Sequence, residues 1–552
     1  MNEPRPAAAT STPKRRAHAQ PPERVDVAIV GAGLGGLVAA ARLAQAGLAV
    51  AVFEGHYAAG GCATQFARGP RRAQYHFDVG LHYVGDCEEG GAIPRMLSEV
   101  GVHDVAFRPM DPDGFDRFVY PGVDFRVPAD LDRYRDRFVD RFPHERRAID
   151  RYVRLVRAVM VAGRVMERPG RPALSDWPAL AVAGARLARF QRATIAEVFD
   201  AIGLRDPGAR AVALGQSGDY GLPPSKVSAL LHMGLAGHYF RGAYYPEGGG
   251  QVIADRLAER IEALGGSVHL RSPVERILVR GGRACGLRLA PRAGGAAREV
   301  RADVVLSNAD YKKTLLELVG REHLPASAAS FAETSEMAAA LFMTFLGIEG
   351  TIAGMGAQNV WQFDSLDVEA FYRDDPSREI TARGCYVTSA THKDPAHASH
   401  HAPAGVTNVE VMTVVPGDLA RFGVDAASVA SWTYAEHPAY VATKRRLEDD
   451  MIRRLDALFP GVAARVVFRE SATPASHVRY TQAAGGTGYG LAATPAQFMK
   501  GRPGYRGPLA GLYLAGASTR AGHGIVGAMA SGAAAARAVL ADRARAVAQV
   551  SR

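Results

Sequence analysis

Apolar and polar positions near the N-terminus alternate in blocks that predict a strand, a turn, a helix and a second strand. The apolar run Val25 to Val30 suits a strand buried within a parallel sheet. A glycine-rich segment then leads into a helix of small apolar residues, and a second apolar strand ends at Glu54. This order of elements is typical of a parallel sheet covered by helices.

Two later blocks continue the alternation. Apolar residues at helical spacing predict a helix that two glycines end, followed by a strand, a hairpin and a further buried strand. The positions concerned are Ile253, Leu257, Ile261, Leu264, Gly265 and Gly266 for the helix, and 267–270, 274–290 and 302–310 for the strands, with the hairpin turn at Gly281 and Gly282. Near the C-terminus, Leu512 to Ala515 predicts a strand that leads through a glycine-rich loop into a helix starting near Gly527. The chain is therefore expected to have an α/β fold.

Residues 151–199 interleave arginine with apolar residues at near-helical spacing and predict basic amphipathic helices. Two interpretations fit this pattern equally. The helices pack on the core with a solvated basic face, or their arginines meet anionic lipid headgroups while the apolar face enters the lipid. The longest candidate for a spanning helix, Met337 to Ile348, has only about a dozen residues and predicts a buried strand or a core helix.

Composition limits the function classes. The chain has 552 residues, of which 47% are hydrophobic and 22% charged, values typical of two or three globular domains. Its 66 basic and 56 acidic side chains leave a net charge of +10. No nucleic-acid-binding module accompanies this excess, so it favours an anionic cofactor or an anionic lipid surface over nucleic acid.

Four scattered cysteines, Cys62, Cys87, Cys285 and Cys385, lack the spacing of a zinc site or a disulfide framework, which indicates a reducing compartment. Residues 1–22 are rich in proline, alanine and basic side chains and have no apolar segment, so they predict a flexible tail and no signal peptide. The protein is thus expected to be cytoplasmic, peripheral on the membrane and not secreted.

The first glycine turn carries a chemical signal. Gly31, Gly33 and Gly36 have the G-x-G-x-x-G spacing that allows a sharp turn, close approach of the backbone to a pyrophosphate, and tight packing of helix on strand. The helix that follows offers its N-terminal amides to phosphate groups. Glu54 lies about twenty residues further on, where a carboxylate accepts hydrogen bonds from a ribose. The segment therefore predicts a dinucleotide-binding site.

Further motifs, in a fixed order, carry a family resemblance. They are GGCATQF (60–66), FDVGLHYVG (77–85), YGLPPSKVSALLHMGLAGHYFRGAYYPEGGG (220–250), TPASHVRYTQAAGGTGYG (473–490) and GLYLAGASTRAGHGIVGA (511–528). With these motifs the chain resembles the FAD-dependent superfamily of phytoene desaturases, carotenoid isomerases and retinol saturases. It is most similar to the retinol saturase branch, and the resemblance covers nearly everything after residue 23.

The resemblance implies a split architecture. A Rossmann-type FAD-binding domain, a parallel sheet with helices on both faces, would be assembled from residues 23–100, 240–330 and 475–552. An α+β substrate domain would be inserted as residues 101–239 and 331–474. FAD would lie extended across the first domain, and the inserts would place the substrate over the flavin ring.

The resemblance also implies individual contacts to FAD. Gly31, Gly33 and Gly36 would hold the pyrophosphate, and Glu54 the adenosine ribose. The remaining contacts, from the adenine to the flavin ring, would come from Val274, Gly60, Gly61, Gly516, Gly524, Ile525 and Val526. The C-terminal helix would direct its positive end toward N1 and the C2 carbonyl, where it stabilises the anionic reduced flavin.

Reduction of a carbon–carbon double bond combines a hydride from flavin N5 with a proton from a positioned donor. Candidate donors in the family-matching motifs are His82, Tyr244, Tyr245, Glu247 and His523. Each also has a structural interpretation: the tyrosines pack near the ring, His82 is a core histidine, and His523 occupies the glycine loop. Cys62 stands where desaturases commonly carry arginine, and we expect a small buried filler there.

Histidines gather in THKDPAHASHH (391–401), which raises the question of a metal site. The surrounding proline, alanine, serine and aspartate residues are typical of a loop, so a solvated segment is the favoured interpretation. We therefore expect no metal.

Together these features predict an FAD-dependent oxidoreductase acting on double bonds of a long apolar polyene or isoprenoid substrate. Saturation is the leading version, and desaturation or cis–trans isomerisation are the alternatives on this scaffold. No second G-x-G-x-x-G motif is visible, so the electron partner is expected to be a quinone or another carrier. Two other classes stay open: a non-catalytic prenyl-lipid carrier, which the C-terminal flavin motif disfavours, and a flavin amine oxidase, which the Phe77 and Tyr244 motifs disfavour.

Overall fold

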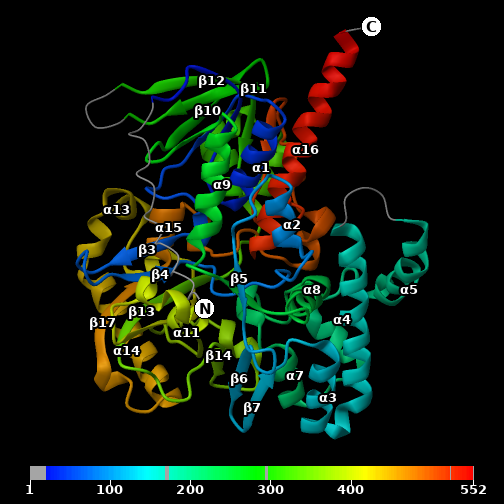
Figure 1. Ribbon diagram of the computed structural model, residues 1–552, viewed down its shortest axis with the longest axis vertical. Coiled ribbons are helices and arrows are strands. Elements are labelled where there is room, and N and C mark those ends of the chain that lie inside the picture. Colours follow the sequence, from blue (N-terminus) through cyan, green and yellow to red (C-terminus); the bar gives the residue numbers. More distant parts are fainter. Residues whose placement is uncertain (1–19, 168–172, 292–295, 523, 551–552) are drawn as a thin grey trace, which may run out of the picture.

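The computed structural model describes residues 20–167, 173–291, 296–522 and 524–550. Its strands build two seven-stranded sheets and two two-stranded ribbons. Figure 1 shows the first sheet in the upper part of the molecule and the second in the lower part. The ribbons are β3 (Gln65–Arg68) with β4 (Tyr75–Asp78), and β5 (Phe107–Pro109) with β8 (Tyr244–Pro246).

Five strands of the first sheet run parallel. In spatial order they are β9 (Ser267–His269), β2 (Val50–Phe53), β1 (Arg24–Val30), β12 (Arg298–Ser307) and β18 (Leu512–Leu514). The predicted hairpin around Gly281 and Gly282 is present as β10 (Val274–Arg280) and β11 (Arg283–Leu289), which extend the sheet antiparallel to β12. The carboxyl ends of the parallel strands meet at one edge, where ligands bind in sheets of this kind.

Four helices pack around this sheet: α1 (Leu34–Gln45), α2 (Ala92–Ser98), α9 (Gln251–Ala263) and α16 (Gly524–Val550). α1 contacts both α9 and α16. A Cβ added at Gly532 of α16 would collide with the carbonyl oxygen of Gly35 in α1, so the two helices touch backbone to backbone. The C-terminal helix begins at Gly524, slightly before the position expected from the sequence.

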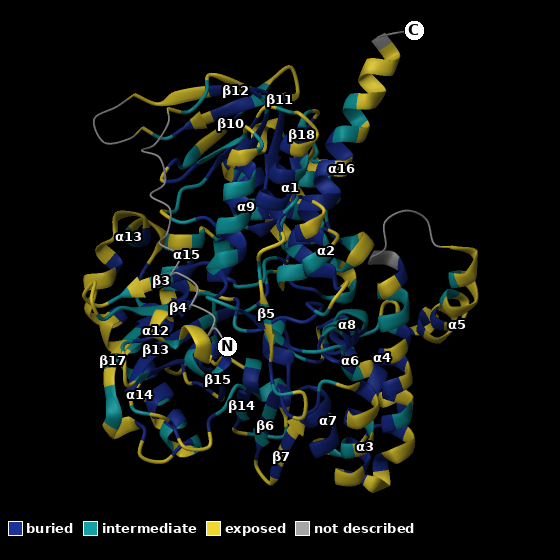
Figure 2. Cartoon of the chain, viewed as in Figure 1, coloured by how far each residue is buried: buried dark blue, intermediate teal, exposed yellow. Residues whose placement is uncertain are grey.

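By length and composition, α16 could also cross a membrane, since an apolar window of 18 residues within Gly524–Gln549 has a mean hydropathy of 1.5. The sequence interpretation missed this segment because it required a run without charges, and α16 contains Arg537 and Asp542. A core helix meets the same criterion, and 39% of the apolar window is buried inside the protein. Figure 2 shows the burial at the start of α16, where it passes α1, and exposure toward its C-terminal end.

The second sheet is mostly antiparallel. In spatial order its strands are β17 (Val466–Ala472), β13 (Ala340–Glu349), β16 (Val406–Val415), β15 (Gly384–Thr388), β14 (Asn359–Phe363), β6 (Asp116–Tyr120) and β7 (Val123–Val127). Only the β14–β6 pair is parallel. The apolar run at 337–348 contributes most of β13, which is buried along nearly its whole length. A Rossmann-type parallel sheet combined with an α+β part confirms the predicted fold class.

Most of the remaining helices surround the second sheet and connect it to the first, whereas α10 (Ala326–Thr334) packs on the first sheet, where its Ala332 is buried in one cluster with Ala28 and Val30. The others are α3 (Leu131–Arg141), α4 (Arg146–Glu167), α5 (Trp177–Leu187), α6 (Ile195–Ile202), α7 (Pro207–Ala213), α8 (Ala229–Tyr239), α11 (Ala390–Lys393), α12 (Ala398–His401), α13 (Ala426–Ser431), α14 (Pro438–Leu458) and α15 (Pro474–Thr481). Of these, α3 to α8 gather on one side of the sheet, next to β6 and β7 (Figure 1).

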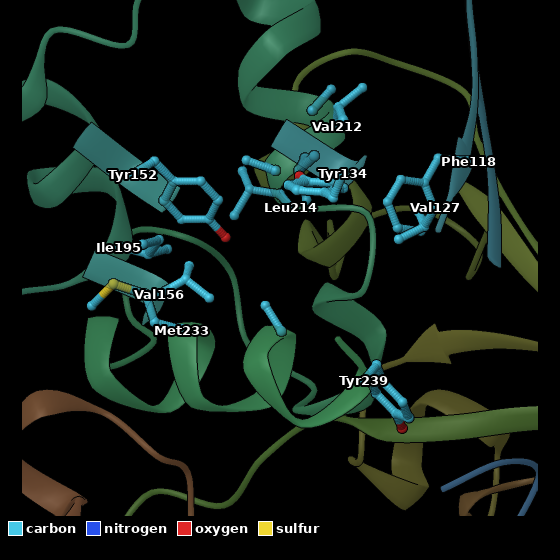
Figure 3. Packing of buried hydrophobic residues seen from close by; sticks show 14 of the residues in the cluster. Phe118, Val127, Tyr134, Tyr152, Val156, Ile195, Val212, Leu214, Met233 and Tyr239 are labelled. Carbon is cyan, nitrogen blue, oxygen red and sulfur yellow. The ribbon is translucent and has the colours of Figure 1, made fainter. Parts of the chain in front are cut away.

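The amphipathic helix α4 packs on the core. Figure 3 shows Tyr152 and Val156 of α4 near Ile195 of α6 and Met233 of α8, all members of one buried cluster. The arginines of α4, including Arg151, lie exposed on the opposite face. For α4, therefore, a packed helix with a solvated basic face is the correct interpretation. α5 differs, because much of its apolar surface is exposed.

We expect Gly532→Ala to lower the free energy of unfolding by about 1–3 kcal/mol, because the added Cβ meets the backbone of α1. Gly184→Ala is the matched control: Gly184 also lies within a helix, but a Cβ there meets no atom within 4 Å. This control should leave the thermal melting temperature unchanged or slightly higher. Equal melting temperatures for the two variants would contradict the backbone contact.

Candidate functional site

A cavity of about 890 Å³ opens at the carboxyl ends of β1, β2 and β12. Residues from both sheets line it. The first sheet contributes Val30, Phe53 and Ser307, and the second contributes Met343 and Phe345. One part of the wall is thus built from strand ends and glycine turns, and another part from apolar side chains of β13.

The turn from β1 into α1 forms one wall of the cavity. Gly31 has φ +91°, in the left-handed region that favours glycine. Gly33 is the N-cap of α1, and no side chain caps the helix, so the amides of its first turn are available to a ligand. Both residues line the cavity. Gly36 does not line it; a Cβ there would collide with the carbonyl oxygen of Gly31, so this glycine permits the turn.

A second glycine turn lies against the first. Gly60 and Gly61 line the cavity and have φ values of +128° and +59°. The Gly60 N–H donates to the Ala32 carbonyl at 2.7 Å, and Gly33 and Gly60 form a parallel β-bridge. The two turns therefore present glycine backbone to the cavity, which leaves room for an extended ligand carrying phosphates.

Glu54 stands at the end of β2 and lines the cavity together with Val274, the first residue of β10. Its Oε2 accepts the Ala32 N–H and its Oε1 accepts the His56 N–H, both at 2.8 Å. These bonds fix the carboxylate, and each oxygen keeps a further lone pair. A ribose hydroxyl is a suitable donor to this position.

The N-terminus of α16 reaches the same cavity. The residues of this segment that line it include Gly516, Gly524 and Ile525, whereas Val526 does not. The Gly516 N–H donates to Ser531 Oγ at 2.7 Å, and a Cβ at Gly35 would lie 2.8 Å from the Ala528 carbonyl oxygen. The N-termini of α1 and α16 therefore lie side by side. Both helices direct a positive dipole end into one space.

None of the four described candidate proton donors lines the cavity. Tyr245 is buried, and its hydroxyl donates to Asp78 Oδ2. His82 Nδ1 lies 2.7 Å from Glu410 Oε2. The two remaining candidates are held by their backbones: the Tyr244 N–H donates to Val84 and the Glu247 N–H to Ala106. The fifth candidate, His523, lies outside the described residues.

Two residues that line the cavity, Tyr489 and Cys62, are not among the proton donors proposed from the sequence. Tyr489 lines the cavity and belongs to the quoted motif 473–490, whose TGYG ending was the available signal. Cys62 also lines it, and its side chain is exposed there, so the expected buried filler was wrong. The surrounding protein nevertheless raises the pKa of the Cys62 thiol by desolvation.

Aromatic and basic residues meet at another part of the lining. Tyr57, Trp432 and Tyr480 are 45%, 44% and 42% exposed, and the rings of Trp432 and Tyr480 lie 5.5 Å apart. Lys444 and Arg445 of α14 line the same cavity. Because exposed aromatic side chains gather there, we identify this region as the mouth of the cavity.

The sequence predicts a solvated loop at 391–401, and this prediction is wrong. This histidine-rich segment contains the short helices α11 and α12, and Asp394 and His401 in it are fully buried. Asp394 lies 2.9 Å from His397 and 3.2 Å from His401. Across the described parts of the chain, no group of three or more His, Cys, Asp or Glu side chains is arranged to hold a metal ion.

The geometry of the cavity suits an extended dinucleotide with a flat ring. One part of the wall contains Glu54 and Val274. The paired glycine turns and the start of α1 form a second part, and the start of α16 forms a third. The apolar side chains of β13 and Phe66 offer a surface for a non-polar ligand. A redox cofactor and an apolar substrate can therefore share this space.

Comparison with known proteins places this architecture in a family. Residues 34–540 match the model of the flavin containing amine oxidoreductases. Among solved structures, an oxidoreductase from Methanosarcina mazei has a TM-score of 0.56 at 20% identity, covering 93% of this chain and 99% of that one. Cyclohexylamine oxidase from Brevibacterium oxydans has a TM-score of 0.54 at 16% identity, covering 93% and 98%. At these identities the two structures show a shared fold.

Curated relatives point to one branch of the family. The chain is 26% identical to all-trans-retinol 13,14-reductase of Danio rerio over 85% of its length and 78% of that protein. It is 29% identical to the Rattus norvegicus protein of the same name, but the match spans only 61% of that chain. Prolycopene isomerase 1 of an Oncidium hybrid cultivar is 24% identical, over 94% of this chain and 84% of the isomerase.

These relatives confirm the superfamily and the retinol saturase branch expected from the motifs. The family match, which spans most of the chain, confirms FAD as the cofactor. The chain therefore belongs to the flavin-containing amine oxidoreductases and is an FAD-dependent oxidoreductase.

Proposed function

We propose that FAD lies extended along the cavity. Glu54 holds the adenosine ribose and Val274 meets the adenine, while Gly31, Gly33, Gly60 and Gly61 bound the pyrophosphate region. Gly516, Gly524 and Ile525 lie along the flavin ring. The supporting observations are the uncapped start of α1, the bare glycine passage, and the start of α16 beside it. Gly36 and Val526 shape the adjoining backbone and lie outside the lining.

We infer that the substrate is a long apolar polyene or isoprenoid and that the reaction adds hydrogen to a carbon–carbon double bond. Bound reduced FAD supplies a hydride for such a step. The observation that carries this proposal is the continuity of the proposed flavin site with the apolar wall of Met343, Phe345 and Phe66. Relatives named as a retinol reductase and a prolycopene isomerase support the substrate class.

Desaturation and cis–trans isomerisation are the alternatives on the same site, since a flavin runs hydride transfer in either direction. A non-catalytic prenyl-lipid carrier is the alternative of another class. Wild-type protein reduced under anaerobic conditions and mixed with detergent-dispersed retinol or a carotene distinguishes them. Saturation predicts return of the oxidised flavin band and a product two hydrogens heavier.

A band that stays bleached, while oxidised protein dehydrogenates or isomerises a polyene, would replace saturation with one of the two alternatives. Purified protein without releasable flavin would favour the carrier. Hydrogen peroxide formed from simple amines, with no effect of any polyene, would contradict the proposed substrate class.

We expect Gly33→Val to lower FAD content at least about tenfold, because a side chain at the N-cap enters the passage and also approaches the Asn308 amide at 2.7 Å. Gly184→Val, with open space around its Cβ, is the control and should keep wild-type flavin content. Flavin released on denaturation, measured by absorbance against protein concentration, checks both. Full occupancy in Gly33→Val would contradict the placement of FAD.

We propose that the protein makes peripheral contact with a membrane through α5 and the turn before it. Leu174, Trp177 and Val182 are 89%, 55% and 51% exposed, and α5 projects beside α4 in Figure 2. Exposed Arg186 and Arg189 follow on the same segment. An exposed apolar surface with adjacent arginines suits an anionic lipid interface, where an apolar substrate and a quinone-type electron carrier dissolve.

The combined variant Trp177→Ser and Val182→Ser should bind phosphatidylcholine vesicles containing phosphatidylglycerol about tenfold more weakly than wild type, since it removes exposed apolar area that the lipid would bury. Val467→Ser is the matched control, because Val467 is 54% exposed but lies on β17. Co-sedimentation measures both. Equal losses for the variant and the control, or no binding by wild type, would contradict contact through α5.

A further inference from the structure

Tyr489 connects the cavity with the interior of the second sheet. It is half-buried and lines the cavity. Its ring packs on the backbone of Gly221, where an added Cβ would lie 2.9 Å from Tyr489 Cδ2. Burial raises the pKa of the Tyr489 hydroxyl, and the charge of Asp219 raises it further. The side chain therefore lines the cavity and lies against Gly221, two residues after Asp219, with which its hydroxyl interacts electrostatically.

The Asp219 carboxyl group is half-buried. The Tyr83 hydroxyl donates to its Oδ2 at 2.6 Å. Burial raises the pKa of Asp219 to about 8, although the Tyr83 hydrogen bond and the charge of Lys393 lower it. At neutral pH Asp219 thus retains its proton and can donate it.

Asp116 continues the network from Tyr83. The Tyr83 hydroxyl lies 3.3 Å from Asp116 Oδ2, which also accepts Gln216 Nε2–H at 2.9 Å. Asp116 Oδ1 accepts from Asn359 Nδ2 at 2.9 Å. Burial raises the pKa of Asp116 to about 6, below that of Asp219. The single hydroxyl of Tyr83 thus joins the buried carboxyl group of Asp116 to the half-buried carboxyl group of Asp219.

Lys393 extends the network to the wall that carries His82. Its Nζ donates to Thr388 Oγ1 and, at 2.6 Å, to the His82 carbonyl oxygen. Thr388 in turn donates to Asn359 at 3.0 Å. Burial lowers the pKa of Lys393 to about 8, opposed by the surrounding carboxylates. Lys393 is therefore a buried cation that balances several carboxyl groups at once.

Asp219 interacts electrostatically with titratable groups from many elements. They are Tyr83, Asp116, Tyr220, Tyr239, Tyr372, Tyr386, Lys393 and Tyr489. The tyrosines stay neutral because burial raises their pKa values, most of them well above the ordinary value. Proton exchange near neutral pH consequently involves Asp219, Asp116 and Lys393.

We propose that Tyr489 is the catalytic proton donor of this oxidoreductase and that Asp219, held by Tyr83, is the positioning residue that restores its proton. The inference rests on the proposed reduction of a double bond. Bound reduced FAD would supply a hydride to one carbon, and the Tyr489 O–H would give its proton to the neighbouring carbon as the π bond breaks. The Tyr489 phenolate takes a proton from the Asp219 carboxyl group, which is then reprotonated from solvent.

Infrared spectroscopy of the oxidised protein tests Asp219 without turnover. Wild type should show the C=O band of a protonated carboxyl group at pH 7, sensitive to deuterium exchange, that fades as the pH rises through about 8. Asp219→Asn should lose this band. Asp364→Asn is the control and should keep it, because Arg454 holds the pKa of Asp364 below its usual range. A band that fades through about pH 8 in Asp219→Asn as it does in wild type would overturn the role of Asp219.

The rate at which a polyene reoxidises the reduced flavin tests the role of Tyr489 as proton donor. Tyr489→Phe should slow reoxidation of the reduced flavin by a polyene at least about a hundredfold, the range of general acid catalysis, while FAD content stays at the wild-type level. Tyr120→Phe is the control, since the Tyr120 hydroxyl is buried against Ala211 and lies outside the cavity lining. A wild-type rate in Tyr489→Phe would overturn the donor while leaving the proposed function intact.

The dependence of the flavin reoxidation rate on pH shows whether Asp219 supplies a proton or has only a structural role. The wild-type rate should fall as the pH rises through about 8, where Asp219 loses its proton. Asp219→Asn should be slow and lose this dependence, and Asp219→Glu should restore part of the rate. An unchanged profile in Asp219→Asn would overturn the relay. Wild-type protein that holds FAD and shows the carboxyl band, but leaves every polyene unchanged, would overturn the proposed function and the donation step with it.

Discussion

Backbone contact between α1 and α16 is the constraint on which the cavity depends. Gly35 and Gly532 lack the side chains that would separate the two helices, and a Cβ at either position would collide with the partner helix or its loop. Because the helices start side by side, two positive dipole ends enter one space. Asn308, at the end of β12, packs against Gly33 and Gly35 and closes this corner. The same glycines thus permit packing and leave room for the cofactor.

The second sheet supplies the other wall and a group of buried ionisable side chains behind it. Burying Asp116 and Lys393, and partly burying Asp219, costs free energy that hydrogen bonds and mutual attraction offset only in part. Their pKa values are displaced toward neutrality, with Asp116 at about 6 and both Asp219 and Lys393 at about 8. Groups that exchange protons near pH 7 beside a redox cavity are suited to chemistry. Tyr489, which lines the cavity, is the side chain that we propose to transfer a proton to the substrate.

The first sheet could be predicted because its signals are local: apolar runs, the spacing of Gly31 and Gly33, and the turn at Gly281 fix neighbouring elements. The periodicity of the sequence predicts an apolar face on α4. It does not predict that Tyr152 packs on other helices, because this packing depends on tertiary contacts. The proton network escaped prediction for the same reason. Asp116 and Lys393 are distant in sequence and approach only because β6, β14 and β15 are adjacent in the sheet.

The most direct test of this account is a crystal structure of the FAD-bound protein. We predict an extended cofactor with its pyrophosphate at the first turn of α1, its ribose at Glu54 and its ring at the start of α16. The ring should face the apolar wall of Met343 and Phe345, with Tyr489 within reach of a substrate placed between them. A flavin ring bound away from the start of α16, or one screened from Tyr489 by other side chains, would contradict the account.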